Sequence, residues 1–210
     1  MDTTVSILLI LGALLVAAIS PGPSFVLVAK FAIGASRNDG VAASIGMGVG
    51  GVMLSILALT GLHAVLTNVP MLFVILKVMG GLYLVYLAVQ IWRGANQTLK
   101  IEVDNSKTQN TFKKPFLIAL VTQLSNPKAA VTYGVIFAAL LPVDFNNIIF
   151  FILPPLVFIV EAGWYLLVTF ILSSESPRAA YLRSKSLFDR IAGSVMAGLG
   201  IKLVSSTGID

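Results

Sequence analysis

Ala18-Ile19-Ser20-Pro21-Gly22-Pro23-Ser24 interrupts an apolar run that extends from Val5 to Ala32. A second interruption, Ser125-Asn126-Pro127-Lys128, lies within another apolar run later in the chain. Proline inside a helix removes a backbone N–H and clashes with the carbonyl four residues before it. In lipid a freed backbone group has no water to bind, so such a break persists only where protein or a cavity satisfies it. Two broken helices at matching places indicate a binding site of the kind that transporters use.

The composition excludes most classes of soluble protein. Of 210 residues, 57% are hydrophobic and 11% are charged, whereas soluble domains contain about 25% charged residues. We therefore expect an all-α integral membrane protein, because long apolar runs cross lipid as helices. Cysteine is absent and His63 is the single histidine, so we expect no metal site and no cofactor. The basic residues that give the net charge of +5 lie beside the apolar runs, which indicates topology and not nucleic-acid binding.

Six segments are long and apolar enough to cross a membrane, which takes about 20 residues each. They are Val5–Ala32, Val41–Leu62, Pro70–Trp92, Pro115–Leu141, Ile148–Leu172 and Leu187–Val204. The prediction is six transmembrane helices, of which the first and the fourth are broken by proline.

The basic residues predict how these spans are oriented. All Lys and Arg residues except Lys77, Lys128 and Lys202 lie in or beside the first, third and fifth loops. Residues 61–69 and 142–147, the second and fourth loops, contain none. Since basic loops stay in the cytoplasm, we expect residues 93–114 to be cytoplasmic and both termini to lie outside.

The polar segment 93–114 divides the chain into residues 1–92 and 115–210, each with three predicted spans. Three is an odd number, so the second half must be inverted relative to the first. Each half begins with a broken helix, as in the inverted repeats of secondary transporters. Alternating access would then come from rocking one repeat against the other.

Each break would place a helix N-terminus inside the membrane. Ser20 can cap the helix that restarts after it, with Pro21 at its first position, and Asn126 can do the same before Pro127. Such a terminus carries free N–H groups and a partial positive charge. In inverted halves both termini point toward the midplane, where they would bind a carboxylate. Ser24 is a further polar candidate for contact with a ligand.

Two ionisable residues lie deep in the predicted spans. Lys128 follows the second break, and a lysine near the bilayer centre costs about 3 kcal/mol on insertion scales. Glu161 lies in the middle of the fifth span. It could bind a substrate ammonium or carry a coupled proton, or it could be the structural ion-pair partner of Lys77 or Lys128.

Several motifs resemble those of the LysE/RhtB family of amino-acid exporters, and the resemblance covers nearly the whole chain. They are Ser20-Pro21-Gly22-Pro23 followed by Gly34, Arg37, Gly40, Gly46 and Gly50; Lys77-x-x-Gly80-Gly81-x-Tyr83-Leu84; Phe112-Lys113-Lys114-Pro115-Phe116 followed by Asn126-Pro127-Lys128-Ala129; and Gly193 followed by Gly198-x-Gly200. The combination of Pro-Gly-Pro with Asn-Pro-Lys-Ala at this separation is the specific part.

The resemblance implies a bacterial inner-membrane exporter of amino acids or related metabolites, driven by the proton motive force. It assigns functional weight to Pro21, Gly22, Pro23, Asn126, Pro127 and Lys128. The chain departs from the family at two positions. Many members have Asp or Asn where this chain has Ser24, and an acid where it has Gly51.

We therefore expect a secondary transporter that exports a small amino acid or related zwitterion, by proton antiport, across the cell inner membrane. The substrate site would consist of Ser20, Pro21, Gly22, Pro23, Ser24, Asn126, Pro127, Lys128 and Glu161. The alternative is a channel or a structural membrane partner without coupled transport. An enzyme is not expected, since the spans offer almost no metal ligands and no base beside a nucleophile. Whether two copies pair as a homodimer is left open.

Overall fold

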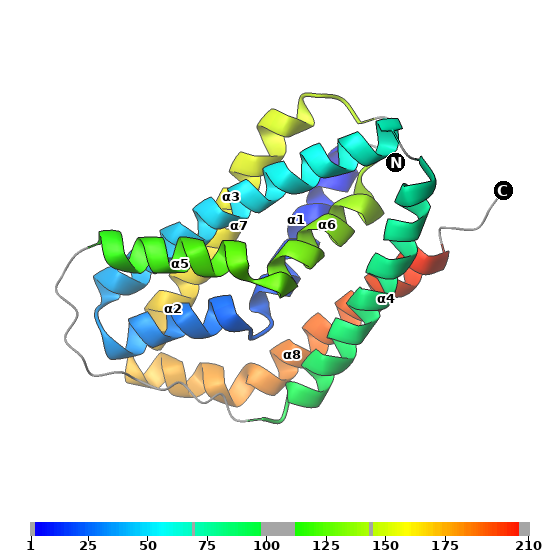
Figure 1. Cartoon of the computed structure of the whole chain (residues 1–210). Coiled ribbons are helices and arrows are strands. Elements are labelled where there is room, and N and C mark those ends of the chain that lie inside the picture. Colours follow the sequence, from blue (N-terminus) through cyan, green and yellow to red (C-terminus); the bar gives the residue numbers. More distant parts are fainter. Residues whose placement is uncertain (1–2, 69, 98–111, 143–144, 206–210) are drawn as a thin grey trace.

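The computed structural model describes residues 3–68, 70–97, 112–142 and 145–205, and within them the fold is entirely helical. The helices are α1 (Thr3–Ile19), α2 (Pro23–Gly34), α3 (Arg37–Asn68), α4 (Pro70–Gly94), α5 (Lys113–Ser125), α6 (Pro127–Leu140), α7 (Ile149–Leu172) and α8 (Glu175–Ser205). They are arranged so that the α1–α2 and α5–α6 junctions lie next to one another near the centre of the molecule (Figure 1).

Both predicted breaks are present. α1 and α2 meet at an angle of 61°, and α5 ends at Ser125, immediately before the restart of the chain as α6. Three helices in the described residues, α3, α4 and α7, are long and apolar enough to cross a membrane, and the bent α1–α2 pair could make a fourth span. α6 is apolar but has only 14 residues. The protein is thus a membrane-embedded helical protein.

The last helix begins earlier than predicted. We expected a loop before a span at Leu187–Val204, but α8 starts at Glu175, so Arg183 and Lys185 are helical. An amphipathic segment is stable as a helix when it covers apolar surface, and Tyr181 stacks on Phe25 of α2 at 5.7 Å between ring centroids. Burial, with a smaller contribution from the carboxylate of Asp189, raises the pKa of the Tyr181 hydroxyl.

Three apolar cores hold the helices together. One joins α1, α3, α6 and α7; a second joins α2, α3, α5, α7 and, through Tyr181, α8; a third joins α4, α6 and α8. Small residues allow close backbone approach at two of the contacts. A Cβ at Gly46 of α3 would collide with the backbone of α5, and a Cβ at Gly200 of α8 would lie 2.6 Å from the carbonyl oxygen of Gly81 in α4.

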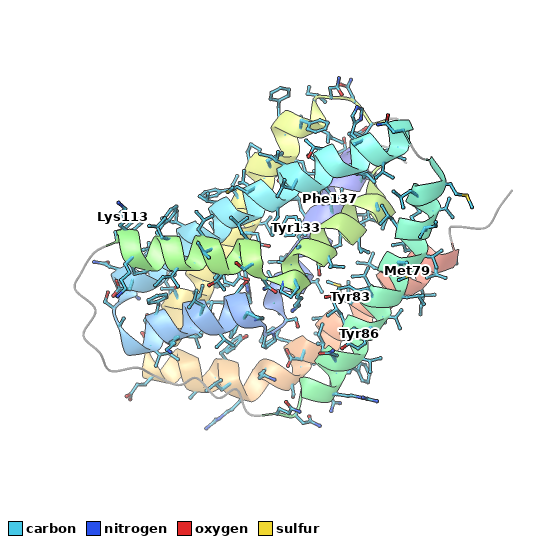
Figure 2. The ribbon with its side chains drawn as sticks, viewed as in Figure 1. Met79, Tyr83, Tyr86, Lys113, Tyr133 and Phe137 are labelled. Atoms are coloured by element: carbon cyan, nitrogen blue, oxygen red, sulfur yellow. The ribbon has the colours of Figure 1, made fainter. Side chains whose placement is uncertain are left out.

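Large apolar side chains also cover much of the outer surface. Met79 and Tyr86 extend outward from α4, whereas Tyr133 and Phe137 of α6 lie among the other helices (Figure 2). Exposed apolar surface of this extent fits a lipid environment. Lys113, by contrast, is exposed at the first turn of α5, within the segment 93–114 that was predicted to be cytoplasmic.

Candidate functional site

The first break leaves backbone carbonyls open at the end of α1. A helical carbonyl accepts the N–H four residues later, and for Ala17 that residue is Pro21, which has no N–H. The side chain of Lys128 takes its place: Nζ lies 3.4 Å from the Ala17 oxygen and 3.1 Å from the Ser20 oxygen. A cation at a helix C-terminus also interacts favourably with the helix dipole. Lys128 therefore satisfies the end of α1 from the other half of the chain.

A second side chain contributes at the same end. Nε1 of Trp164, in α7, donates to the carbonyl oxygen of Ala18 at 3.1 Å. A buried carbonyl without a donor would be costly. The open end of α1 is thus closed by contacts from α6 and α7.

The predicted N-cap of the helix that follows the first break was wrong. α2 begins at Pro23 and its N-cap is Gly22, in an extended conformation (φ −157°, ψ −174°), without a side-chain cap. The second proline moves the start, because Pro at the first helical position presets the required φ. Ser20 is buried and its carbonyl oxygen, not its hydroxyl, makes the contact described above.

The cap at the second break is present as predicted. Oδ1 of Asn126 accepts a hydrogen bond from the backbone N–H of Lys128 at 3.0 Å, and Pro127 occupies the first turn of α6. Nδ2 of Asn126 donates to Oγ of Ser24 at 2.9 Å. Since Ser24 belongs to the first turn of α2, this bond places the N-termini of α2 and α6 side by side.

A chain of buried hydrogen bonds continues from this point into the protein. Oγ of Ser24 donates to Oε1 of Gln123 at 2.6 Å, and Nε2 of Gln123 lies 3.5 Å from Oε2 of Glu161. The hydroxyl of Tyr133 donates to Oε1 of Glu161 at 3.0 Å. All four side chains are buried. The chain links both breaks to the carboxyl group in the middle of α7.

These groups surround a small pocket of about 30 Å³. Its lining includes the predicted residues Ser20, Gly22, Ser24, Asn126, Lys128 and Glu161. Six predicted residues, from the two breaks and from α7, thus converge on one pocket.

The three predicted prolines lie elsewhere. Pro21 lines a neighbouring cavity, and Pro23 and Pro127 are exposed at the starts of α2 and α6. Their contribution is to fix where the helices break and restart.

Sequence reasoning missed Gln123 and Tyr165, which also line the pocket. Gln123 could have been found, since it is a polar residue inside the predicted fourth span, three positions before Asn126, and polar residues within spans are expensive and functional. Tyr165 gives no such signal because tyrosines are common in membrane helices.

The site suggests ligands with both charges. Its lining holds one ammonium and one carboxyl group, together with neutral polar side chains such as Gln123 and Asn126 and apolar ones such as Leu14 and Phe25. In the described residues, the hydrogen-bond partners of Glu161 are Tyr133 and Gln123, and those of the Lys128 ammonium are carbonyl oxygens. No group of three His, Cys, Asp or Glu side chains in that part of the chain could hold a metal ion.

Comparisons with known proteins found a matching family and several relatives. A family model described as LysE type translocator matches residues 15–207. The "Threonine efflux protein" of Escherichia coli strain K12 is 29% identical over 197 residues, covering 91% of this chain and 94% of that protein. The protein of the same name from Salmonella typhi is 30% identical over 193 residues, with the same coverage.

An "Uncharacterized membrane protein" of Haemophilus influenzae is 29% identical over 189 residues, covering 88% of this chain and 89% of that protein. No solved structure matches the chain. The family match spans nearly the full length and includes both breaks, the polar pocket and α8. The chain belongs to the LysE family of translocators.

Proposed function

We propose that this protein is a secondary transporter that exports a small amino acid, or a related zwitterion, from the cytoplasm in exchange for protons. The observation that carries the proposal is the polar chain from Asn126 through Ser24 and Gln123 to Glu161, with Lys128 beside it. This chain joins two helix breaks inside a membrane-embedded protein. Discontinuous helices that meet in this way form the substrate sites of many secondary transporters.

The two charged groups suit the two ends of an amino acid. The substrate carboxylate would bind at the N-termini of α2 and α6 and the ammonium of Lys128. To do so, it would compete with the carbonyl oxygens of Ala17 and Ser20, which accept from Lys128 now. The substrate ammonium would bind Glu161, displacing the donor groups of Tyr133 and Gln123.

Glu161 also provides a group for proton coupling. It is 3% exposed, so its charged form needs compensation from neighbouring donors or a cation. A carboxyl group that is ionised with a substrate ammonium and protonated without it would couple export to proton entry. On this proposal, substrate and proton exclude one another at Glu161.

The topology that we propose is six spans in two inverted repeats, residues 1–92 and 115–210, joined by a cytoplasmic segment 93–114. Both termini would lie in the periplasm and the protein in the bacterial inner membrane. Two features support the repeat. Each half contains one helix broken by proline, and the equivalent helices of the halves pack in pairs, α3 on α7 and α4 on α8.

The substrate to test first is L-threonine, because relatives that cover most of the chain are threonine efflux proteins. In inside-out membrane vesicles, an imposed proton gradient, acid inside, should drive uptake of labelled L-threonine. The rate should saturate with substrate and fall when an uncoupler is added. A rate that stays proportional to substrate and ignores the uncoupler would favour a channel and reject the proposal.

The site is tested by replacing each of two lysines with methionine. Lys128→Met should abolish uptake, whereas Lys202→Met should retain it, because Lys202 is exposed at the far end of α8. Both variants should elute as single species in detergent, which would exclude loss of folding as the cause. Uptake by Lys128→Met at the original rate would refute the assignment of the site.

A further inference from the structure

A second cavity lies directly beside the pocket and is much larger. It has a volume of about 250 Å³, compared with about 30 Å³ for the pocket. Ser20 and Lys128 line both, so the break after α1 and the Lys128 side chain form the wall between them. The larger cavity therefore offers a ligand far more room than the pocket does.

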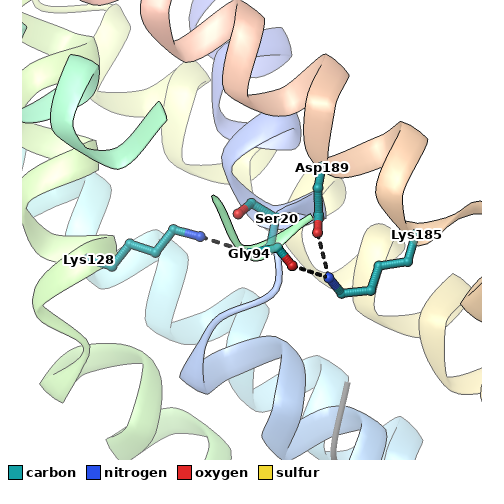
Figure 3. Close-up of polar contacts among 5 residues, drawn as sticks. All are labelled: Ser20, Gly94, Lys128, Lys185 and Asp189. Carbon is teal, nitrogen blue, oxygen red and sulfur yellow. Dashed lines mark hydrogen bonds and ion pairs between the residues drawn. The ribbon is translucent and has the colours of Figure 1, made fainter. Parts of the chain in front are cut away.

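The larger cavity contains a buried ion pair. Nζ of Lys185 lies 2.7 Å from Oδ2 of Asp189, and the two side chains are 8% and 4% exposed. Lys185 also donates to the carbonyl oxygen of Gly94 at 3.0 Å. Figure 3 shows Lys185 and Lys128 reaching toward this region from different helices, α8 and α6. The pair therefore ties α8 to the end of α4 at the cavity.

One oxygen of this ion pair is left without a donor. Oδ1 of Asp189 is buried, and no hydrogen-bond donor in the described residues reaches it. A buried carboxylate oxygen without a donor is unfavourable, and a donor from outside the chain would relieve the cost. Asp189 lines the cavity, so a ligand ammonium there could supply that donor once the carboxyl group turns Oδ1 toward it.

The opposite wall offers a partner for an anionic group. An ammonium has three N–H donors, and Lys128 uses two acceptors, the oxygens of Ala17 and Ser20. The third donor of Lys128 is available to a ligand carboxylate. The cavity thus has an acceptor oxygen on one wall and a cationic donor on the other, an arrangement that matches a zwitterion.

We propose that this cavity, which we call the vestibule, is the first docking site of the zwitterionic substrate, with the substrate ammonium on Asp189 and its carboxylate on Lys128. The inference rests on the proposed function and its topology. Gly94 lines the vestibule and lies at the start of the segment predicted to be cytoplasmic, so the vestibule would face the cytoplasm. The substrate enters the vestibule from the cytoplasm. It moves to the buried pocket when Lys128 leaves the carbonyl oxygens of α1.

Cysteine labelling tests the vestibule without measuring transport. The chain contains no cysteine, so Gln90→Cys places a single thiol at the vestibule lining. L-threonine should slow its reaction with a small methanethiosulfonate by about tenfold at about ten times the Kd. Arg183→Cys is the control, because Arg183 is exposed and does not line the vestibule. Its labelling should not depend on L-threonine.

The role of Asp189 is tested in the Gln90→Cys background. Asp189→Asn keeps the size of the side chain and an acceptor for Lys185 but removes the charge, and it should abolish protection by L-threonine. Asp189→Glu should retain protection. N-acetyl-L-threonine, which lacks the ammonium, should not protect. Protection that persists in Asp189→Asn would overturn the assignment of the ammonium to this residue.

Failure of this inference can be distinguished from failure of the proposed function. Glu161→Gln should lose proton-driven uptake but keep protection of the Gln90→Cys thiol, since Glu161 does not line the vestibule. Equal labelling rates with and without L-threonine, L-serine or L-homoserine would overturn the vestibule, whether or not the protein transports them. Absence of uptake with intact protection would reject the export function and leave the docking site supported.

Discussion

Oγ of Ser24 lies 2.6 Å from Oε1 of Gln123, and this bond joins α2 to α5 at the level of both helix breaks. Both side chains are buried, and each has a further partner: Ser24 accepts from Asn126, and Gln123 reaches Glu161. The bond is thus the central link of the polar chain. Its loss should affect both stability and transport.

Ser24→Ala and Gln123→Leu should each lower the free energy of unfolding by about 1–3 kcal/mol, because each leaves a buried polar partner unpaired. The double variant should cost less than the sum by more than about 0.5 kcal/mol, since the two residues interact. Unfolding in detergent with a denaturant titration measures all three. Ser125→Ala, at an exposed position, should change stability by less than about 0.5 kcal/mol. Strict additivity would contradict a direct coupling.

Asn126→Ala and Asn126→Ser separate the cap from the link to Ser24. Alanine loses the cap of α6 and the bond to Ser24, and it should cost about 2 kcal/mol in total, about 1 for each. Serine can still cap the helix, so its cost should be about 1 kcal/mol. The comparison uses thermal unfolding of both variants in the same detergent. Equal losses would show that the cap contributes nothing.

Gly51→Ala, a substitution in α3, should disturb the carboxyl group of Glu161. A Cβ at this position would lie 2.8 Å from the Tyr133 hydroxyl and 3.1 Å from Cγ of Glu161. Overpacking of this kind costs about 1–3 kcal/mol, and L-threonine uptake should fall. Gly61→Ala is the matched control on the same helix, because a Cβ there meets nothing within 4 Å. Full uptake by Gly51→Ala would mean that the Tyr133–Glu161 pair can shift without loss of function.

The same contact predicts a rescue. Glu161→Ala should abolish proton-driven uptake and also empty the space beside residue 51. Gly51→Asp added to that variant brings a carboxyl group into the same region from α3, and it should restore part of the uptake. The test measures uptake in the single and the double variants at equal expression. No recovery would show that the carboxyl group must come from α7.

Pro21→Ala should lower transport without lowering stability. Alanine supplies the N–H that Ala17 lacks, so α1 can extend and Lys128 loses its role at that carbonyl. Thermal stability should stay equal or rise, while uptake falls. Pro155→Ala restores a helical N–H at an exposed position in α7, away from the pocket, and it should keep uptake. Uptake by Pro21→Ala at the original rate would argue against a functional role of the break.

The positions of both breaks could be predicted because their causes are local. Proline lacks the N–H, and asparagine caps the next helix, whatever the rest of the fold does. The start of α2 was misplaced at Pro21, with Ser20 as its cap, for a related reason: either proline could occupy the first turn, and the later one, Pro23, does so.

The partners of the charged residues could not be predicted, because they depend on packing between distant segments. Lys128 binds carbonyl oxygens more than 100 positions earlier, and nothing in the composition of α1 indicates this. Lys185 was assigned to a basic loop, and its burial beside Asp189 follows only from the early start of α8.

Three glycines hold four of the long helices together in two close pairs. Gly48 of α3 packs against Ala162 of α7, and Gly81 of α4 against Gly200 of α8, so closely that a methyl group on any of these glycines would collide. Helices packed this closely move as one rigid unit, and each of the two pairs contains one helix from each half of the sequence. The proline breaks after α1 and α5 lie outside both pairs, so the chain can bend there without separating either pair. Opening this protein would bend the chain at its two proline breaks and keep the two halves of the sequence packed together. One repeat would then not rock against the other as a whole.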